Sequence, residues 1–466
     1  MEVVLLSRIQ FAVTVAFHFI FPCLSIGLAW LNVIFLAKYR KSKSEDDLRL
    51  SYFWVNLFGI TFAVGAATGV VMVFQFGSNW ADFTHYAASM FVPPLVAEAT
   101  IAFFLEATFI GILIWGRGKV SKALYFVSSV MVAIGATLSA FIIVAVDSWM
   151  QTPAGYIKDA AGNPEMLDGK VQLDNFFEAV FNPSTMPRIT HTLIACLITG
   201  AGFVLGISAW YLLKKKKQEF AMKSMGVAIV VLLVCSVAQW VVGHWHTLEV
   251  VEKQPLKLAA FEGLFESTEE GEGAELLIFG IPDQEKEVTN LKIGIPKMLS
   301  FLAYGDFDAP VTGIKDAAAE ENVPKEEWPS VLLSFFSYRT MMALGTFFLL
   351  FGLWGIFLKA RKKLQDSSLF LRIALISAPF GLIAAEVGWM AAEIGRQPWI
   401  IQGMMKTSDA ISDKVPAEQI LVSVLLFVAL YLILTLAYVF LVKRKVEEGP
   451  DAISLTGSHT EGRIEA

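Results

Sequence analysis

Long apolar stretches, separated by short polar segments, run through the whole sequence. A helix needs about 20 mostly apolar residues to cross the roughly 30 Å hydrocarbon core of a bilayer. Backbone groups inside a bilayer must be satisfied within the segment itself, so unbroken apolar stretches of this length form helices. A membrane β-barrel would instead show strands of about ten residues with alternating polarity. We therefore expect an all-α polytopic integral membrane protein with nine transmembrane helices, over about residues 9–37, 52–77, 94–116, 122–149, 188–213, 220–242, 331–358, 369–393 and 417–442.

Composition supports a membrane protein. The 466-residue chain is 55% apolar and only 17% charged, whereas an ordinary soluble domain carries about 25% charged residues. Its net charge of −6 offers no basic surface, which excludes nucleic acid as a partner. No basic segment or small-residue cleavage site precedes the first apolar stretch, so we expect no signal peptide. The three cysteines stand singly in apolar stretches, which argues against a cysteine-held zinc or iron–sulfur site.

Basic residues gather in alternate connecting segments. Lysine and arginine are frequent in the segments 38–51, 117–122, 214–223, 359–363 and 443–445, whereas the segment 78–93 has none. Basic loops stay in the cytoplasm of a membrane protein. The pattern therefore predicts an N-terminus outside and a C-terminus in the cytoplasm, which agrees with an odd number of spans.

The sequence divides into four segments on this basis. We expect transmembrane helices 1–6 over residues 1–242, an extracytoplasmic loop over 243–330, helices 7–9 over 331–443 and a cytoplasmic polar tail over 444–466. Within 261–330, 16 acidic residues face five lysines and no arginine. Loops of this length are usually functional or disordered. Two interpretations stay open, a solvated acidic flap and a loop that handles a substrate.

Ionisable side chains inside the apolar stretches are the strongest candidates for function, because they are costly in a membrane. They are His18, Glu98, Glu106, Arg188, His191, Arg339, Glu386 and Glu393. Each also has a structural interpretation, such as a hydrogen bond between helices. A proton-coupled transporter that uses Glu98, Glu106 and Glu386 is the alternative function.

The depth of these residues favours redox chemistry. In the predicted orientation the costly groups gather in the outer half of the membrane, whereas transporters bind their solutes near the midplane, beside broken helices. Met341 lies two residues after Arg339. Histidine and methionine are both axial ligands of haem iron. The residues alone do not decide which side chains share a haem, because the candidates lie on different spans.

Four motifs make the chain similar to a known family. They are SRIQFAVTVAFHF near the start, QPLKLAAFE at 254–262, SFFSYRTMMALG at 334–345 and GRQPW at 395–399. With nine spans and a large outer loop after the sixth, the chain resembles subunit I of cytochrome bd-type quinol oxidases over nearly its whole length. The resemblance implies a terminal respiratory oxidase of the bacterial cytoplasmic membrane. Such an enzyme oxidises quinol at the outer face and reduces O₂ to water with cytoplasmic protons, which generates a proton gradient without pumping.

The resemblance also implies cofactors and their ligands. The family carries a low-spin haem b, a high-spin haem b and a third haem, which is haem d or haem b in its place. By motif, His191 and Met341 match the axial ligands of the low-spin haem. His18 and Glu393 match the ligands of the two high-spin haems, and which residue holds which haem stays open.

Further roles follow from the same resemblance. Glu98 and Glu106 match an acidic pair that delivers protons, and Trp389 matches a residue between haems. Lys257 and Glu262 match the quinol pair of the outer loop. Three arginines are suited to haem propionates, since guanidinium binds carboxylate bidentately: Arg8, Arg339 and Arg396. The implied partners are subunit II of the oxidase and a small single-span accessory subunit. One departure is Asp147, where members of the family more often have asparagine.

Overall fold

The computed structural model describes residues 3–412, 414–453 and 455. Eight helices are long and apolar enough to cross a membrane, and a pair bent by 41° makes a ninth crossing. The nine predicted spans and the all-α class are confirmed. The crossing helices are α1 (Val3–Ser42), α2 (Glu45–Gly77), α4 (Ala88–Ala97) with η1 (Glu98–Ala102) and α5 (Phe103–Trp115), α6 (Lys122–Gln151), α8 (Thr185–Leu213), α9 (Gln218–Lys253), α13 (Val331–Ala360), the bent pair α14 (Ser368–Ile376) and α15 (Phe380–Gly395), and α16 (Ala417–Glu448).

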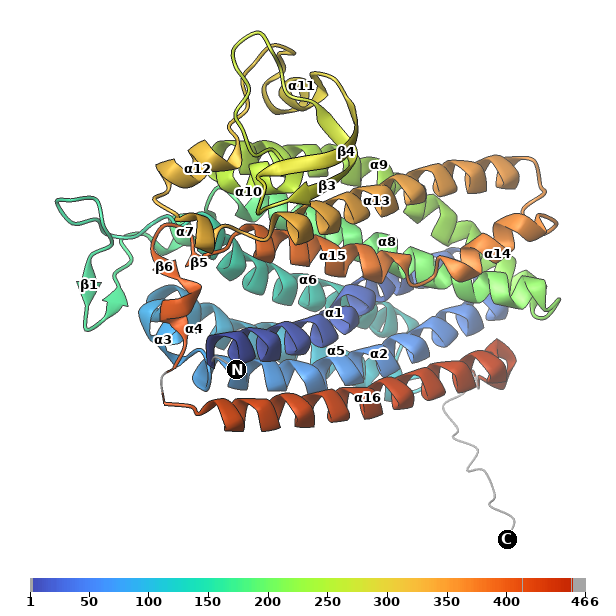
Figure 1. The fold of residues 1–466 in the computed structure, drawn as a ribbon. Helices are drawn as coiled ribbons and strands as arrows, with labels where there is room; N and C mark the ends of the chain where they lie inside the picture. The colour runs from blue at the N-terminus through green and yellow to red at the C-terminus, as the bar shows by residue number, and fades with distance from the viewer. Residues whose placement is uncertain (1–2, 413, 454, 456–466) are drawn as a thin grey trace.

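Helix α1 occupies the centre of the bundle. It packs against α2, α6, α8, α15 and α16, and these helices run side by side in Figure 1. The closest approach joins α1 to α8 at Gly27 and Gly200, where a Cβ added to Gly27 would lie 2.2 Å from the carbonyl oxygen of Cys196. Only glycine allows two helix backbones to come this close. The crossing fixes α8, which carries His191, against the central helix.

Two helices extend beyond the predicted boundaries. Helix α9 continues to Lys253, so residues 243–253 are helical and do not belong to a loop. Helix α16 continues to Glu448, so the first residues of the predicted tail are helical as well. Polar side chains end an apolar stretch without ending the helix, and α9 stops only where Pro255 starts the next helix.

Residues 254–330 form a folded cap over one end of the bundle (Figure 1). Its elements are α10 (Pro255–Glu262), β3 (Leu276–Asp283), β4 (Val288–Ile295), α11 (Met298–Tyr304), α12 (Ile314–Glu320) and η2 (Lys325–Glu327). Strands β3 and β4 pair antiparallel, with Leu276 opposite Ile295. Helix α10 packs on α12 through Leu256 and Ala259, which share a buried cluster with Ile314. The cap is therefore an ordered structure, not a solvated flap.

Short elements from other connections lie at the same end as the cap. They are α3 (Ala81–Tyr86), β1 (Met166–Leu167), β2 (Lys170–Val171), α7 (Phe176–Val180), β5 (Trp399–Ile401), β6 (Met405–Lys406) and η3 (Thr407–Ala410). The lysine-rich and arginine-rich connections lie at the opposite end, beside α14 (Figure 1). We call the two ends the cap end and the basic end.

Candidate functional site

A buried cluster of charges lies where α6, α8 and α15 reach the cap end. Arg188 of α8 approaches Asp147 of α6 at 3.5 Å, and Arg396, directly after α15, approaches the same carboxylate at 3.9 Å. Arg396 also forms an ion pair with Glu393. The two arginines are only 6% and 4% exposed. Breaking one pair in such a cluster is costly, because it leaves an uncompensated buried charge.

Gln151, at the end of α6, connects this cluster to the cap. Its amide nitrogen donates to Glu393 at 3.0 Å, and its amide oxygen accepts a hydrogen bond from Lys257 of α10. The Gln151 side chain is fully buried. One amide therefore joins a residue of the predicted quinol pair to a predicted haem ligand.

Lys257 is 2% exposed, although it lies outside the membrane-spanning helices. It also donates to the amide oxygen of Gln254 at 2.8 Å. Burial lowers the pKa of Lys257 well below its ordinary value, and the positive charges of Arg188 and Arg396 lower this pKa further. Burial at this position therefore disfavours the charged form of the amine.

Glu262, the other residue of the predicted quinol pair, has a different partner. Both of its carboxylate oxygens face Arg339 of α13, one at 3.3 Å and the other in an ion pair. The Arg339 guanidinium also lies over the rings of Phe335 and Tyr338. Lys257 and Glu262 thus share one short helix but engage separate parts of the bundle.

The predicted ligands His191 and Met341 lie on helices that enclose one region. Helix α8 packs on α9 and α15, and α13 packs on the same two helices. Each ligand faces a glycine of a neighbouring helix, since an added Cβ would lie 3.5 Å from His191 at Gly243 and 2.8 Å from Met341 at Gly388. The imidazole of His246 lies 5.6 Å from that of His191 between ring centroids.

His18 of α1 makes a hydrogen bond to α2. Its Nδ1 lies 2.9 Å from the hydroxyl oxygen of Thr68. The Thr68 hydroxyl oxygen also lies 3.1 and 3.0 Å from the carbonyl oxygens of Val64 and Gly65. When the hydroxyl donates to one of these carbonyls, it accepts from Nδ1, and Nε2 then keeps its lone pair for a metal. His18 also faces a glycine, because a Cβ at Gly69 would lie 3.2 Å from its ring.

The predicted acidic pair faces α6. Glu98 accepts a hydrogen bond from Ser139 at 2.8 Å, and Glu106 packs on Gly135 one turn further along the same helix. Glu106 is only 7% exposed. The segment that starts at Glu98 is a π-helical turn, which the regular-helix prediction did not include. Such turns are rare and frequently lie at functional sites.

The remaining predicted residues lie apart from these contacts. Trp389 is half-buried on α15, one turn before Glu393. Arg8 lies on an exposed position of α1 and forms no salt bridge with any described residue. Glu386 of α15 has a buried oxygen without a hydrogen-bond partner in the described part of the chain.

Unpartnered polar atoms fit the haems that the resemblance implies. Among the described residues, no three His, Cys, Asp or Glu side chains gather to hold a bare metal ion. A haem supplies four nitrogens to its iron and needs only one or two axial ligands, so single ligands on separate helices suit it. Buried donors and acceptors without a hydrogen-bond partner include His191 Nδ1, His246 Nε2, Arg188 Nε, Arg339 Nε and Arg396 Nε. Free guanidinium donors suit propionates, and glycines beside the ligands leave room for a flat ring.

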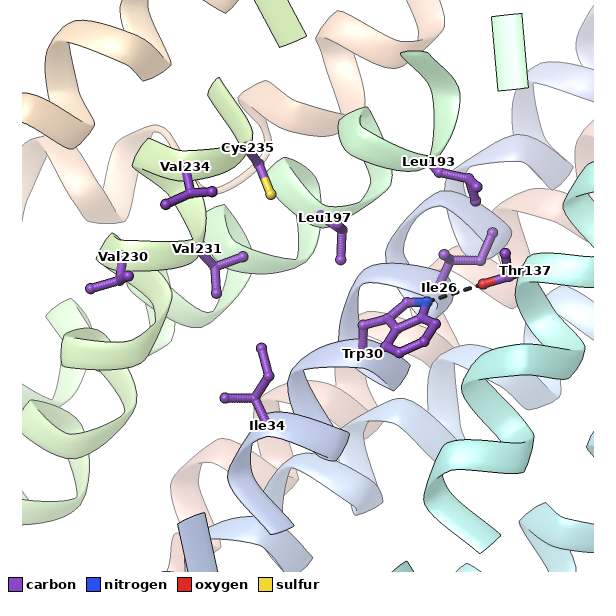
Figure 2. Close-up of a pocket in the computed structure, with 10 residues that line it drawn as sticks. All are labelled: Ile26, Trp30, Ile34, Thr137, Leu193, Leu197, Val230, Val231, Val234 and Cys235. Carbon is purple, nitrogen blue, oxygen red and sulfur yellow. Dashed lines mark hydrogen bonds between the residues drawn. The ribbon is translucent and has the colours of Figure 1, made fainter. Parts of the chain in front are cut away.

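A separate apolar cavity of about 520 Å³ lies between α1, α6, α8 and α9 (Figure 2). Its only hydrogen bond among the side chains drawn joins Trp30 to Thr137 at 3.0 Å. None of the predicted site residues lines it. The lining residues are Ile26, Trp30, Ile34, Thr137, Leu193, Leu197, Val230, Val231, Val234 and Cys235.

The sequence-based search missed several neutral or peripheral residues of the site. Gln151, Gln254 and Gln402 connect its charged groups, and Thr68 orients His18. Glu321 accepts hydrogen bonds beside them. A glutamine at the end of an apolar span is a signal that could have identified Gln151. Nothing in the sequence distinguishes Glu321 from the other acids of the cap.

Fold and site define a multi-pass membrane protein whose buried polar groups fit haem. The family described as "Cytochrome bd terminal oxidase subunit I" matches residues 6–450, and the chain belongs to this family. Membership implies haem cofactors and a place in the bacterial cytoplasmic membrane. It decides against the transporter that was the alternative function.

Curated relatives and a solved structure match this chain over nearly its full length. The chain is 37% identical to cytochrome bd ubiquinol oxidase subunit 1 of Bacillus subtilis, over 97% of this chain and 95% of that protein. It is 32% identical to cytochrome bd-II ubiquinol oxidase subunit 1 of Escherichia coli, over 97% and 98%. The bd oxidase structure from Geobacillus thermodenitrificans matches with a TM-score of 0.86 and 29% identity, over 96% of this chain and 99% of that chain.

Proposed function

We propose that the chain is the haem-bearing subunit of a quinol:O₂ oxidoreductase, with its quinol site at the cap end. The observation that carries this proposal is the buried link from Lys257 through Gln151 to Glu393. A residue suited to a quinone oxygen and a residue suited to iron belong to one hydrogen-bonded network. Electron transfer between a quinol and a haem requires such proximity.

The ligand assignments extend this proposal. His191 and Met341 would hold the low-spin haem b, while His18 and Glu393 would hold the high-spin haem b and the third haem, which is haem d or haem b. Bound haem supplies reversible one-electron storage and, where one axial position stays open, a place for O₂. His18 can bind through Nε2 when its Nδ1 donates to Thr68. Arg339 and Arg396 keep unpartnered guanidinium atoms for propionates.

The two ends of the bundle suggest where protons are released and where they are taken up. We place the basic end in the cytoplasm, as the positive-inside rule requires, and the cap end outside. Quinol protons would leave at the cap, and Glu98 and Glu106 would hold protons that come from the cytoplasmic side. Separate release and uptake would generate a proton gradient without pumping.

The proposed assembly includes subunit II and a small single-span accessory subunit. The relatives' names designate subunit 1 of an oxidase, which implies at least a second subunit. Trp389 would lie between the haems and Arg8 near a propionate.

The test of the quinol site is Glu262→Ala in the complete oxidase. Quinol oxidation should be abolished, while O₂ consumption with a donor that reduces the haems directly should survive. Arg339 loses its counter-ion in both variants. Glu262→Gln keeps the size of the side chain, so it separates the loss of the carboxylate from a loss of packing. Glu270→Ala, at an exposed position of the cap, is the matched control. Normal quinol turnover in both Glu262 variants, with intact haem spectra, would refute the proposed site.

A further inference from the structure

Glu321 lies directly after α12, on the face that this helix turns toward α10. Ala317 and Ile314 of α12 share a buried cluster with Leu256 and Ala259 of α10. Residues four apart lie on the same face of a helix. Glu321 follows Ala317 by four residues, so it lies on the same face of the chain as the residues that pack on α10.

The Glu321 carboxylate has neutral hydrogen-bond donors as its partners. Its Oε2 accepts from the indole nitrogen of Trp399 at 3.0 Å and from the amide of Gln402 at 2.9 Å. It forms no salt bridge with any residue that the structure describes. The charged groups that act on it are Lys257 of α10 and Glu320 of its own helix, and burial raises its pKa above that of an ordinary carboxyl group.

A directed series of hydrogen bonds joins Lys257 to Glu321. Lys257 donates to Gln254 at 2.8 Å, Gln254 donates to Gln402 at 3.3 Å, and Gln402 donates to Glu321 at 2.9 Å. Every bond points the same way, so the bond dipoles reinforce one another. The amine and the carboxylate are therefore the two ends of one polarised network, with the positive end at Lys257.

Glu262 and Glu321 differ in their partners. Both oxygens of Glu262 face the Arg339 guanidinium, so this carboxylate is engaged in an ion pair. Glu321 has no such cation, and the cap around it borders solvent.

We propose that Glu321 is a proton acceptor of the quinol site, through which a quinol proton leaves to the aqueous phase at the cap end. This inference rests on the proposed quinol site. Oxidation of one quinol to quinone breaks two O–H bonds and releases two protons and two electrons. The electrons reduce O₂ in the oxidase reaction. Glu321 takes one of the protons on a carboxylate oxygen, becomes a neutral carboxylic acid, and returns to the carboxylate when it loses that proton to water. The second proton also passes to water at the cap end.

The test is Glu321→Gln in the complete oxidase, with Glu320→Gln as the matched control. Glutamine keeps an oxygen that can accept from Trp399 and Gln402, but it cannot bind the proton. General acid–base groups contribute typically 10² to 10⁴ in rate. We expect the kcat for quinol oxidation to fall about 100-fold, with little change in KM and in the haem spectra. The control, at an exposed neighbouring position, should keep the wild-type kcat.

A pH profile separates a proton acceptor from a structural residue. The base must be deprotonated, so wild-type kcat should rise with pH through the pKa of Glu321. Glu321→Gln should lose this rise and Glu321→Asp should retain it. A wild-type kcat and pH profile in Glu321→Gln would overturn the inference, and so would a uniform loss of activity with a raised KM. If Glu262→Ala abolishes quinol oxidation and Glu321→Gln does not, only the role of Glu321 fails. If neither substitution matters, the quinol site itself is wrong.

Discussion

Thr68→Val tests whether His18 is a haem ligand without changing the ligand itself. Valine keeps the β-branched shape of threonine but cannot accept the hydrogen bond from His18 Nδ1, which measures 2.9 Å. Thr68 is 1% exposed, so the packing around it should be preserved. The substitution leaves a buried N–H group without a partner and frees the imidazole to rotate or to move its proton to Nε2. Either change weakens binding of iron at Nε2.

The expected magnitude follows from the lost hydrogen bond. Leaving a buried donor unsatisfied costs about 1–3 kcal/mol, which corresponds to roughly 5- to 150-fold in an equilibrium constant. Partners that orient a metal-bound histidine typically contribute 10- to 100-fold in affinity. We therefore expect Thr68→Val to lower the affinity for one high-spin haem by at least about fivefold.

The assay measures haem per polypeptide and the rate at which haem moves to an excess of a haem-binding acceptor protein. Thr68→Val should lose one high-spin haem faster than wild type, while the low-spin signal stays unchanged. Thr68→Ser keeps the hydroxyl group and should behave as wild type. If Thr68→Val retains all its haem at the wild-type rate, Thr68 does not orient a ligand and the assignment of His18 loses its structural support.

Two further predictions concern the low-spin haem and proton delivery. Gly388→Ala places a Cβ 2.8 Å from the sulfur of Met341, so the low-spin spectrum should weaken or turn high-spin; Gly345→Ala, where nothing lies within 4 Å, should leave it unchanged. An unchanged low-spin spectrum in Gly388→Ala would count against Met341 as a ligand. Glu106→Gln keeps the shape of the buried side chain but removes proton exchange, so quinol should still reduce the haems while O₂ reduction slows strongly. Single-turnover kinetics on the reduced enzyme should place the defect after O₂ binding, and steady-state turnover near wild type would show that Glu106 is structural.

The number and class of the helices could be predicted because span length has a direct physical cause. A bilayer of fixed thickness requires long apolar helices, and the nine stretches correspond to the nine crossings. Helix ends could not be predicted, since α9 continues through a polar segment to Lys253. The hydropathy of the sequence also does not predict the bend at residues 377–379 or the π turn at Glu98. The fold of the cap depends on contacts between α10 and α12, which composition does not encode.

The candidate site could be predicted only in part. Ionisable residues such as His18 and Glu106 are conspicuous because they are rare in apolar spans. Neutral residues such as Gln151 and Thr68 cost much less to place in a membrane, so the sequence-based search missed them. Contacts between side chains of different helices could not be predicted either, because the spacing of residues along one helix does not show which helices are its neighbours. The ion pair between Glu262 and Arg339 is an example, since the two residues are 77 positions apart.

Asp147 shows how the charge cluster and the implied haem can fit together. Its carboxylate lies 3.5 Å from Arg188 and 3.9 Å from Arg396, so it is a counter-ion to both guanidinium groups, with 30% of its side chain exposed. A carboxylate in this place competes with a propionate for the same guanidinium groups. It does not saturate them, because Arg188 Nε and Arg396 Nε have no partner in the described chain. The arginine pair therefore keeps one donor on each guanidinium, which supports the propionate that we propose there beside Asp147.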